Sequence, residues 1–399
     1  MENTNFRQNR GQEIVQSIGK FEKFQKKAGY HLVPSQTSKA VYKVDATNFT
    51  CTCPDFTFRR IDCKHVIAVK IQQKHIEREN VVPFVGRNKY TQDWTAYNKS
   101  QTSEKAEFLR LLSDLTRSIE EPEQMNGRPS LPLGDMIFSV VFKVFSQMSS
   151  RRFQTDINDA HAKGFINECP SYNSLTRYLA SEAMTPYLQM LVEETSKPLA
   201  SLETAFAVDS TGLSVSSSVS WNRAKHQDKP MLAKKRWLKI HCCVGTHTNV
   251  ITGVEITDNY ANDHTSFIPV VDATRKNFTV KEVSADLAYS SMKHAAYTEL
   301  HGIENYIPFK ENTTAEEIYG ATSIWRKMYH YFNLHRTEFI GHYMKRSNVE
   351  TTFHMLKSKY GSTLKSRSFE AQKNEALCKV ICHNISCLIH AVNEFGIEI

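Results

Sequence analysis

Two carboxylates follow short apolar runs in the second half of the chain. Asp209 ends the run 205–209, and Asp286 comes directly after the run 280–285. A buried strand that ends in an aspartate places the carboxylate at the rim of a sheet, and Mg²⁺ prefers such oxygen ligands. Carboxylates from separate elements can hold two such ions about 4 Å apart for phosphoryl transfer. Taken alone, each aspartate is more typical of a turn or a helix cap.

A third carboxylate lies on a helix that we predict over residues 343–360. If each residue turns the helix by about 100°, Tyr343, Arg346, Glu350 and Lys357 fall within an arc of about 60°. Arginine offers a planar fork to phosphate oxygens and lysine a point charge, so the stripe suits a metal ligand between groups that hold phosphates. The alternative is a solvated face on which Arg346 and Glu350 form an i,i+4 ion pair.

Four further residues have the types and spacing of a zinc site. They are Cys51, Cys53, Cys63 and His65, in the pattern C-x-C, nine residues, C-x-H. Thiolate and imidazole ligands in so tight an array favour a closed tetrahedral site, which is structural, not catalytic. A segment this small buries little apolar surface, so we expect Zn²⁺ to contribute directly to its folding. The alternative is three unpaired cysteines that happen to lie near a histidine.

Composition limits the class of protein. A chain of 399 residues favours two or three domains, and a net charge of +8 with a pI near 8.9 permits a polyanionic partner without proving one. Two basic runs, 221–239 and 357–373, favour contact with nucleic acid.

The polar N-terminus resembles no signal peptide, and the apolar stretch 136–145 is too short to cross a bilayer. We therefore expect a soluble, cytoplasmic protein with no membrane partner. The other six cysteines, which lie in segments that resemble buried strands or helices, fit the same compartment.

Periodicity predicts the elements that must position these side chains. In the first half we expect strands at 41–44 and 49–53, a linker at 80–87, and helices at 65–73, around 108–115, and at 134–146, 153–162 and 171–183. Ser171 is the predicted cap of the last of these helices, which leaves Asn173, Thr176 and Arg177 outward. Such a helix pair can enter a DNA groove or simply pack the core.

The second half alternates strands and helices. After the strand at 205–209 we expect a hairpin of 237–244 and 250–256, a helix at 265–275 capped by Asp263, the strand 280–285, a helix at 290–301, a strand at 305–309, and finally the helix 343–360. This order of strand, hairpin, helix, strand, helix, strand and helix indicates an α/β domain with a mixed sheet.

The helical stripe carries a resemblance. Tyr343-x2-Arg346-x3-Glu350-x6-Lys357 is similar to the Tyr–Arg–Glu–Lys signature of a large group of bacterial and archaeal insertion-sequence transposases, and the segments around Asp209 and Asp286 resemble those around the first two acids of that group. The resemblance covers about residues 100–395. It implies an RNase H-like fold, a mixed sheet flanked by helices, with a triad of Asp209, Asp286 and Glu350. Positions 286 and 350 are only 64 apart, too close for the large β-rich insertion that some members carry between these acids.

The cysteine and histidine pattern resembles a second family, the SWIM zinc finger, which is associated with DNA or protein contacts. Together the resemblances imply three regions: a zinc-binding module over 1–82, a helical DNA-binding or dimerisation region over 83–202, and an RNase H-like catalytic domain over 203–399.

They also imply a function. The expected activity is that of a DNA transposase, which cleaves transposon ends and transfers strands into target DNA with Mg²⁺ or Mn²⁺, and which acts on double-stranded DNA as a homo-oligomer in a synaptic complex. In this reading Tyr343, Arg346 and Lys357 hold the DNA phosphates. Two alternatives stay open: a nuclease or resolvase on the same scaffold, and a catalytically inactive, domesticated DNA-binding protein.

Overall fold

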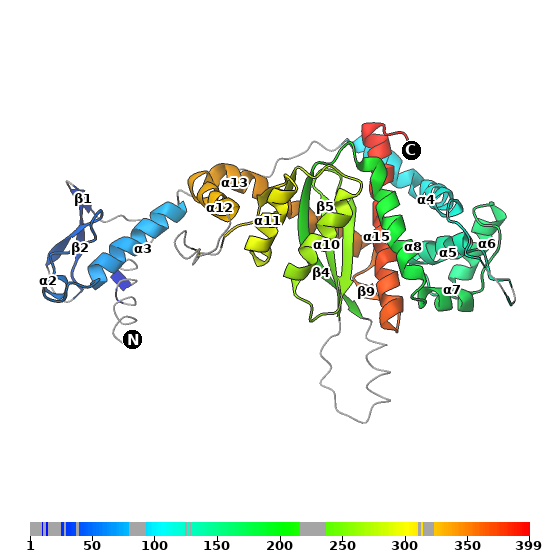
Figure 1. Ribbon diagram of the computed structural model, residues 1–399, viewed down its shortest axis with the longest axis horizontal. Helices are drawn as coiled ribbons and strands as arrows, with labels where there is room; N and C mark the ends of the chain where they lie inside the picture. Colours follow the sequence, from blue (N-terminus) through cyan, green and yellow to red (C-terminus); the bar gives the residue numbers. More distant parts are fainter. Residues whose placement is uncertain are drawn as a thin grey trace, which may run out of the picture. The chain divides into compact units, whose positions relative to one another are not determined.

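The computed structural model describes residues 10, 13–14, 25–27, 29–36, 40–79, 93–123, 126–127, 129–215, 237–309, 313 and 323–399. The chain divides into two compact units, Met1–Lys89 and Tyr90–Ile399 (Figure 1). The predicted linker at 80–87 and most of the basic run at 221–239 lie outside the described residues.

The first unit is a small sheet packed against helices. Strands β1 (Gln25–Lys27), β2 (Tyr30–Pro34) and β3 (Val41–Asp45) pair antiparallel in that order, and helices α2 (Pro54–Arg59) and α3 (Lys64–Glu79) follow. Its buried cluster includes Val33, Val44, Val66 and Val69 together with three cysteines. So few large apolar side chains make a weak core for an independent unit.

One strand expected in this unit is wrong. Residues 49–53 form no strand; Cys51 makes only an isolated antiparallel bridge to Val44. The reason is local: the Asp45 carboxylate accepts hydrogen bonds from the backbone N–H groups of Thr47 and Asn48, and Phe49 takes a left-handed φ of 51°. These turns bend the chain instead of extending it.

The second unit begins with helices that share one core with a long C-terminal helix. They are α4 (Trp94–Arg117), α5 (Leu133–Ser146), α6 (Phe153–Ala162), α7 (Tyr172–Leu179), α8 (Met184–Ser196) and α15 (Phe369–Phe395). Helix α15 packs against α4, α5 and α8. It is long and apolar enough to cross a membrane, but 89% of its apolar window is buried inside the unit. It is therefore the central helix of a folded core.

The remainder of this unit contains a six-stranded mixed sheet. Five of its strands follow the order β6-β5-β4-β7-β8, namely β4 (Ala205–Val215), β5 (Trp237–Gly245), β6 (Ile251–Thr257), β7 (Glu282–Ala285) and β8 (Glu304–Tyr306). Strands β4, β5 and β6 are antiparallel, whereas β7 and β8 run parallel to β4. The short β9 (Thr363–Leu364) also pairs parallel with β4. The predicted fold class, a mixed sheet flanked by helices, is confirmed.

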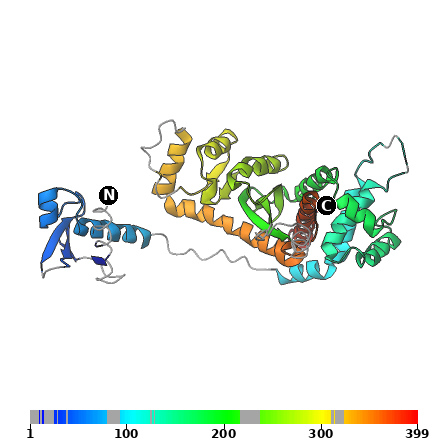
Figure 2. The same cartoon turned by 90° about the horizontal axis from the view of Figure 1, so that it is seen from below.

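The two faces of this sheet carry different helices. Phe206 and Val208 point into a cluster with α10 (Asp263–Arg275), whereas Ala207 and Leu213 join the larger core that contains α15 and α14 (Ser347–Tyr360). Figure 2 shows the helical run through α14, in orange, passing along the sheet toward α15. Because side chains alternate along a strand, Asp209 belongs to the face that α14 covers.

Several helix boundaries differ from the predicted ones. Ser171 does cap α7, but the helix ends at Leu179 and a separate helix, α8, follows. Asn262, not Asp263, caps α10, because its side chain accepts the N–H of His264. The helix between β7 and β8 is α11 (Met292–Leu300), and it follows the short 3₁₀ turn η2 (Leu287–Tyr289).

The predicted helix over 343–360 is also interrupted. Two helices precede it, α12 (Ser323–Leu334) and α13 (Arg336–Tyr343), and the 3₁₀ turn η3 (Met344–Arg346) separates α13 from α14. Nor is it the last long element, because α15 follows it. Among the six cysteines expected in buried strands or helices, Cys169 is partly exposed in the loop between α6 and α7.

Candidate active site and zinc centre

Asp209 and Asp286 lie at the same level of two neighbouring strands. The last register pair of parallel strands β4 and β7 is Val208 with Ala285, so Asp209 is the next residue of β4 and Asp286 is the first residue after β7. The expectation that the first strand ends at Asp209 is wrong, because β4 continues to Val215. The site is at a rim nonetheless: pairing with β7 stops here, and β9 joins β4 only from Ser214 onward.

The two aspartates use their oxygens in the same way. In Asp209, Oδ1 accepts the backbone N–H of Ser210 at 2.8 Å, and in Asp286, Oδ1 accepts the N–H of Leu287 at 2.6 Å. This leaves both Oδ2 atoms facing the guanidinium of Arg346, at 3.6 Å from Asp209 and 3.9 Å from Asp286. The backbone hydrogen bonds fix the orientation of both carboxylates.

Arg346 brings the third carboxylate to the same place. Its Nη1 lies 2.7 Å from Oε1 of Glu350, one helical turn further on. The arginine side chain is 18% exposed, and its Nε is buried with no hydrogen-bond partner among the described residues. One guanidinium therefore lies within 4 Å of carboxylate oxygens from β4, from the end of β7 and from α14.

The other two residues of the stripe come before Arg346 and after Glu350 in the chain. Tyr343 is the last residue of α13, and burial raises the pKa of its phenol. Lys357 donates from Nζ to Oγ1 of Thr211 on β4 at 2.6 Å, and burial lowers the pKa of its ammonium group. Thr211 and Asp209 are two residues apart on one face of β4, so Lys357 reaches the sheet just beyond the aspartate.

Burial also affects the first aspartate. Desolvation raises the pKa of the Asp209 carboxyl, and the neighbouring Asp286 and Glu350 act in the same direction, whereas the N–H of Ser210 and the charge of Arg346 oppose them. Three carboxylates this close need a compensating positive charge. In the free protein Arg346 supplies one charge.

The donor set of this group fits a hard divalent cation. All candidate ligands are carboxylate oxygens, which Mg²⁺ and Mn²⁺ prefer, and they already surround one cationic group. The side chains of Asp286 and Glu350 are 46% and 59% exposed, which leaves room for the waters and phosphate oxygens that Mg²⁺ keeps in its shell.

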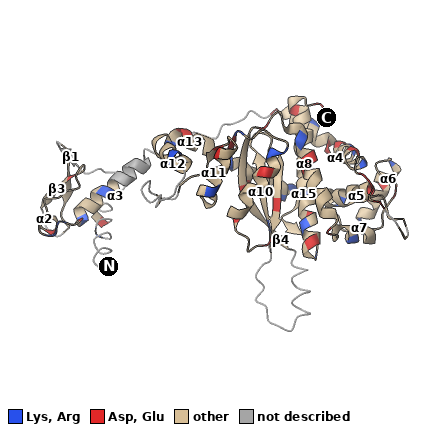
Figure 3. Cartoon of the chain, viewed as in Figure 1, with Lys and Arg blue, Asp and Glu red and all other residues tan. Residues whose placement is uncertain are grey.

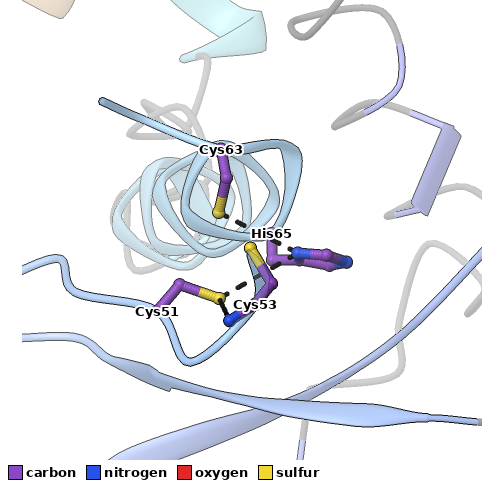
Figure 4. Close-up of side chains that lie close together, drawn as sticks. All are labelled: Cys51, Cys53, Cys63 and His65. Carbon is purple, nitrogen blue, oxygen red and sulfur yellow. Dashed lines mark hydrogen bonds between the residues drawn. The ribbon is translucent and has the colours of Figure 1, made fainter. Parts of the chain in front are cut away.

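The four candidate zinc ligands meet in the first unit. One ligand atom from each of Cys51, Cys53, Cys63 and His65 lies within 4.8 Å of the others, and all four residues are buried. Nδ1 of His65 is 4.0 Å from the sulfur of Cys51 and 3.9 Å from that of Cys63 (Figure 4). Ligands about 2.3 Å from a tetrahedral Zn²⁺ lie about 3.7 Å apart, so the four atoms fit this ion with small adjustments.

Local structure explains this convergence. Cys53 caps α2 and its sulfur accepts the N–H of Phe56. Cys63 comes just before α3 and His65 lies in the first turn of that helix. A hydrogen bond from Cys51 lowers the pKa of the Cys63 thiol, burial opposes this effect, and His65 adds to it, so the thiolate form that binds Zn²⁺ is favoured at Cys63.

Several lysines of the two basic runs contact other residues of the protein itself. Lys239, at the end of the first run, forms an ion pair with Asp263 at 2.5 Å. In the second run, Lys359 pairs with Glu104, and Lys365 donates to the carbonyl oxygen of Gln147. Figure 3 shows acidic and basic residues interspersed on α4, α8 and α15. These described residues therefore do not form a simple basic face.

Comparison with known proteins agrees with the two motifs. Residues 200–385 match the family model described as transposase DDE domain, and residues 42–74 match the SWIM zinc finger. The first match contains all three carboxylates and the second contains all four zinc ligands. These two matches support transposase as the class of protein and Zn²⁺ as a structural ion.

A solved structure is also similar over much of its length. It is described as the cryo-EM structure of piggyBac transposase synaptic complex with hairpin DNA, with 12% identity and a TM-score of 0.35 over 79% of this chain and 77% of that chain. A TM-score this low defines no shared fold. The family match assigns no role to Tyr343, Arg346 or Lys357, whose functions stay predictions.

Proposed function

We propose that this protein is a DNA transposase that cleaves transposon ends and joins them to target DNA, with Asp209, Asp286 and Glu350 as ligands for divalent cations. The observation that carries the proposal is the single guanidinium of Arg346 within 4 Å of all three carboxylates. When bound, a pair of Mg²⁺ or Mn²⁺ ions would stabilise charge on the attacking and leaving oxygens of a phosphodiester.

The residues around the triad would hold the DNA. Arg346 offers a planar fork to phosphate oxygens, and Lys357 a single ammonium group on the same side of β4. Tyr343 keeps its proton because its pKa is raised, so its hydroxyl can donate a hydrogen bond to a phosphate oxygen. These contacts would place the phosphodiester in line for attack by water during cleavage and by a 3′-hydroxyl during strand transfer.

The other regions would bind and assemble. We assign residues 1–82 to a zinc-stabilised contact module, 83–202 to DNA binding or dimerisation, and 203–399 to catalysis. The exposed positions Asn173, Thr176 and Arg177 on α7 suit contact with double-stranded DNA. Joining two ends requires both in one complex, so the working form would be a homo-oligomer on DNA, in the cytoplasm and at the nucleoid.

Products formed from paired ends and a target plasmid test this function. Inverted repeats that flank the gene supply the ends, and the full-length protein is incubated with them in Mg²⁺. A transposase yields ends covalently joined to the plasmid, and Asp286→Asn abolishes both cleavage and joining. Cuts without joined products would indicate a nuclease, and salt-dependent binding without any cleavage would indicate a DNA-binding protein; either result contradicts the proposal.

A further inference from the structure

A largely buried carboxylate joins the turn that carries Arg346 to the strand that leads to Asp286. Glu282, the first residue of β7, has a side chain that is only 12% exposed and uses both of its oxygens. Oε2 accepts a hydrogen bond from Nδ1 of His342 at 2.7 Å, and Oε1 forms an ion pair with Nζ of Lys345. Both partners lie within four residues of Arg346.

We call the contacts of Glu282 with His342 and Lys345 the clamp. Within it, the ring of His342 has a second contact. Tyr306 on β8 stacks on the ring of His342, with centroids 4.3 Å apart and planes 5° from parallel. Tyr306 is in register with Ser284 of β7, and it also meets the fully buried Phe339 of α13 edge to face. The end of α13 is therefore fixed to strands β7 and β8 by the hydrogen bond from His342 to Glu282 and by aromatic packing.

Helix α14 has a separate attachment. Asn348 donates from its side-chain amide to the carbonyl oxygen of Thr246, and Thr352 donates to Oδ1 of Asn249 at 3.2 Å. Both acceptors belong to the turn between β5 and β6. Glu350 lies between these two donors in the chain, so the hairpin holds the part of α14 that carries it.

The 3₁₀ turn η3 carries Lys345 of the Glu282 attachment and leads directly into α14, which the hairpin holds. A 3₁₀ stretch between α-helices often marks a hinge, because its hydrogen bonds are weaker. Tyr343 and Arg346 are on the side that Glu282 holds, and Glu350 is on the side that the hairpin holds. Loss of one attachment should therefore disturb the residues that it holds more than those that the other attachment holds.

We propose that Glu282 is a positioning residue that sets Tyr343 and Arg346 against Asp286 for DNA phosphate, without contacting DNA or metal itself. The expected effect on DNA binding rests on the proposed function, but the contacts that Glu282 makes can be tested without any measurement of activity. Its carboxylate neutralises Lys345 and orients His342, and these two side chains hold η3 on the sheet.

The test compares Glu282→Gln with Glu299→Gln, an exposed glutamate on α11, in the full-length protein. In Glu282→Gln the backbone amides of 343–347 should exchange with solvent about tenfold faster or more, while those of 348–356 are unchanged. The KM for transposon-end DNA should rise about tenfold, and the Mg²⁺ concentration for half-maximal rate should not rise. Asn348→Ala should give the reverse pattern, a higher Mg²⁺ requirement with little change in the KM for DNA.

Unchanged hydrogen exchange of the amides of 343–347 in Glu282→Gln would overturn the proposal. A fall in apparent kcat with an unaltered KM would also overturn it, because that pattern indicates only a loss of folded protein. Lys345→Met removes one arm of the clamp and should show a smaller form of the same exchange pattern, which keeps the test valid if Glu282→Gln does not fold. If the wild-type protein cleaves no DNA, the proposed function fails while the exchange experiment still decides on the clamp.

Discussion

Asp209 and Asp286 stand side by side, each one residue beyond the last paired residues of parallel strands β4 and β7. Each turns Oδ1 to the next backbone N–H and Oδ2 to Arg346. The two aspartates occupy equivalent positions because parallel strands in register end their pairing at the same level. The register of the sheet thus places two of the three proposed metal ligands, and α14 supplies the third, Glu350.

Arg346 and divalent cations require the same carboxylate oxygens. Replacing Arg346 by glutamine removes a positive charge from within 4 Å of all three carboxylates. We therefore expect Arg346→Gln to bind Mn²⁺ more tightly than the wild type in the absence of DNA, by about tenfold or more. Titration followed by electron paramagnetic resonance measures this affinity. Lys327→Gln, an exposed lysine on α12, is the control, and equal affinities in all three proteins would contradict the prediction.

Zinc removal should unfold one unit and spare the other. The first unit has a small core that includes three of the four ligands, so loss of the metal leaves buried thiols and few packed side chains. With a chelator, or in Cys63→Ser, protease should cut within 40–79 and leave a stable fragment of the second unit. Cys169→Ser, outside the cluster, should behave as wild type. Protection of 40–79 at saturating chelator would contradict this.

Two buried histidines predict acid sensitivity. Desolvation lowers the pKa of His294 and of His383 to about 4, and each donates to a backbone carbonyl oxygen, that of Tyr289 and of Asn249. Because the folded-state pKa lies below the unfolded value of about 6.5, the stability they contribute is complete above about pH 6.5 and is lost as the pH falls toward 4. The loss is on the order of 3 kcal/mol per histidine.

Urea unfolding at a series of pH values measures this loss. His383→Gln keeps an amide donor but cannot gain the proton, so its stability should fall less steeply between pH 6.5 and 4 than that of the wild type. An identical slope in the two proteins would show that His383 is not neutral and buried in solution.

The contact between α10 and the sheet depends on one glycine. A Cβ at Gly253 of β6 would lie 2.1 Å from the carbonyl oxygen of Val270 and 3.0 Å from Oγ1 of Thr274. Gly253→Ala should therefore lower the free energy of unfolding by about 1–3 kcal/mol, because helix and strand must separate. Gly341→Ala, where nothing lies within 4 Å, is the matched control and should be neutral or slightly stabilising. Equal stability of the two variants would be inconsistent with this packing.

The sequence predicted the order of elements well where the signal was local. Alternating runs and turn residues located the hairpin β5–β6, and apolar periodicity located α4, α5 and α6. The triad was predicted by the side-chain types and by the resemblance, and the zinc ligands by their spacing. Their convergence, however, depends on strand register and helix packing, which only the three-dimensional structure gives.

What the sequence did not predict has physical causes. Helix α15 is buried on nearly every side, so it lacks the apolar and polar faces that periodicity detects. The strand β4 continues past Asp209 because β5 pairs with it as far as Ser214, a long-range effect. Glu282 had no motif around it, because its partners His342 and Lys345 lie about 60 residues away in the chain.

Cleavage by Glu350→Gln tests the central claim most directly. The substitution keeps the size of the side chain and removes only its charge, and the i,i+4 partner Arg346 can still donate to the amide oxygen. With transposon-end DNA in Mg²⁺, the account predicts a loss of cleavage rate on the order of a thousandfold or more. Glu338→Gln, an exposed glutamate on α13, should cleave as the wild type does. A Glu350→Gln protein that cleaves at the wild-type rate would contradict a metal site made by Asp209, Asp286 and Glu350.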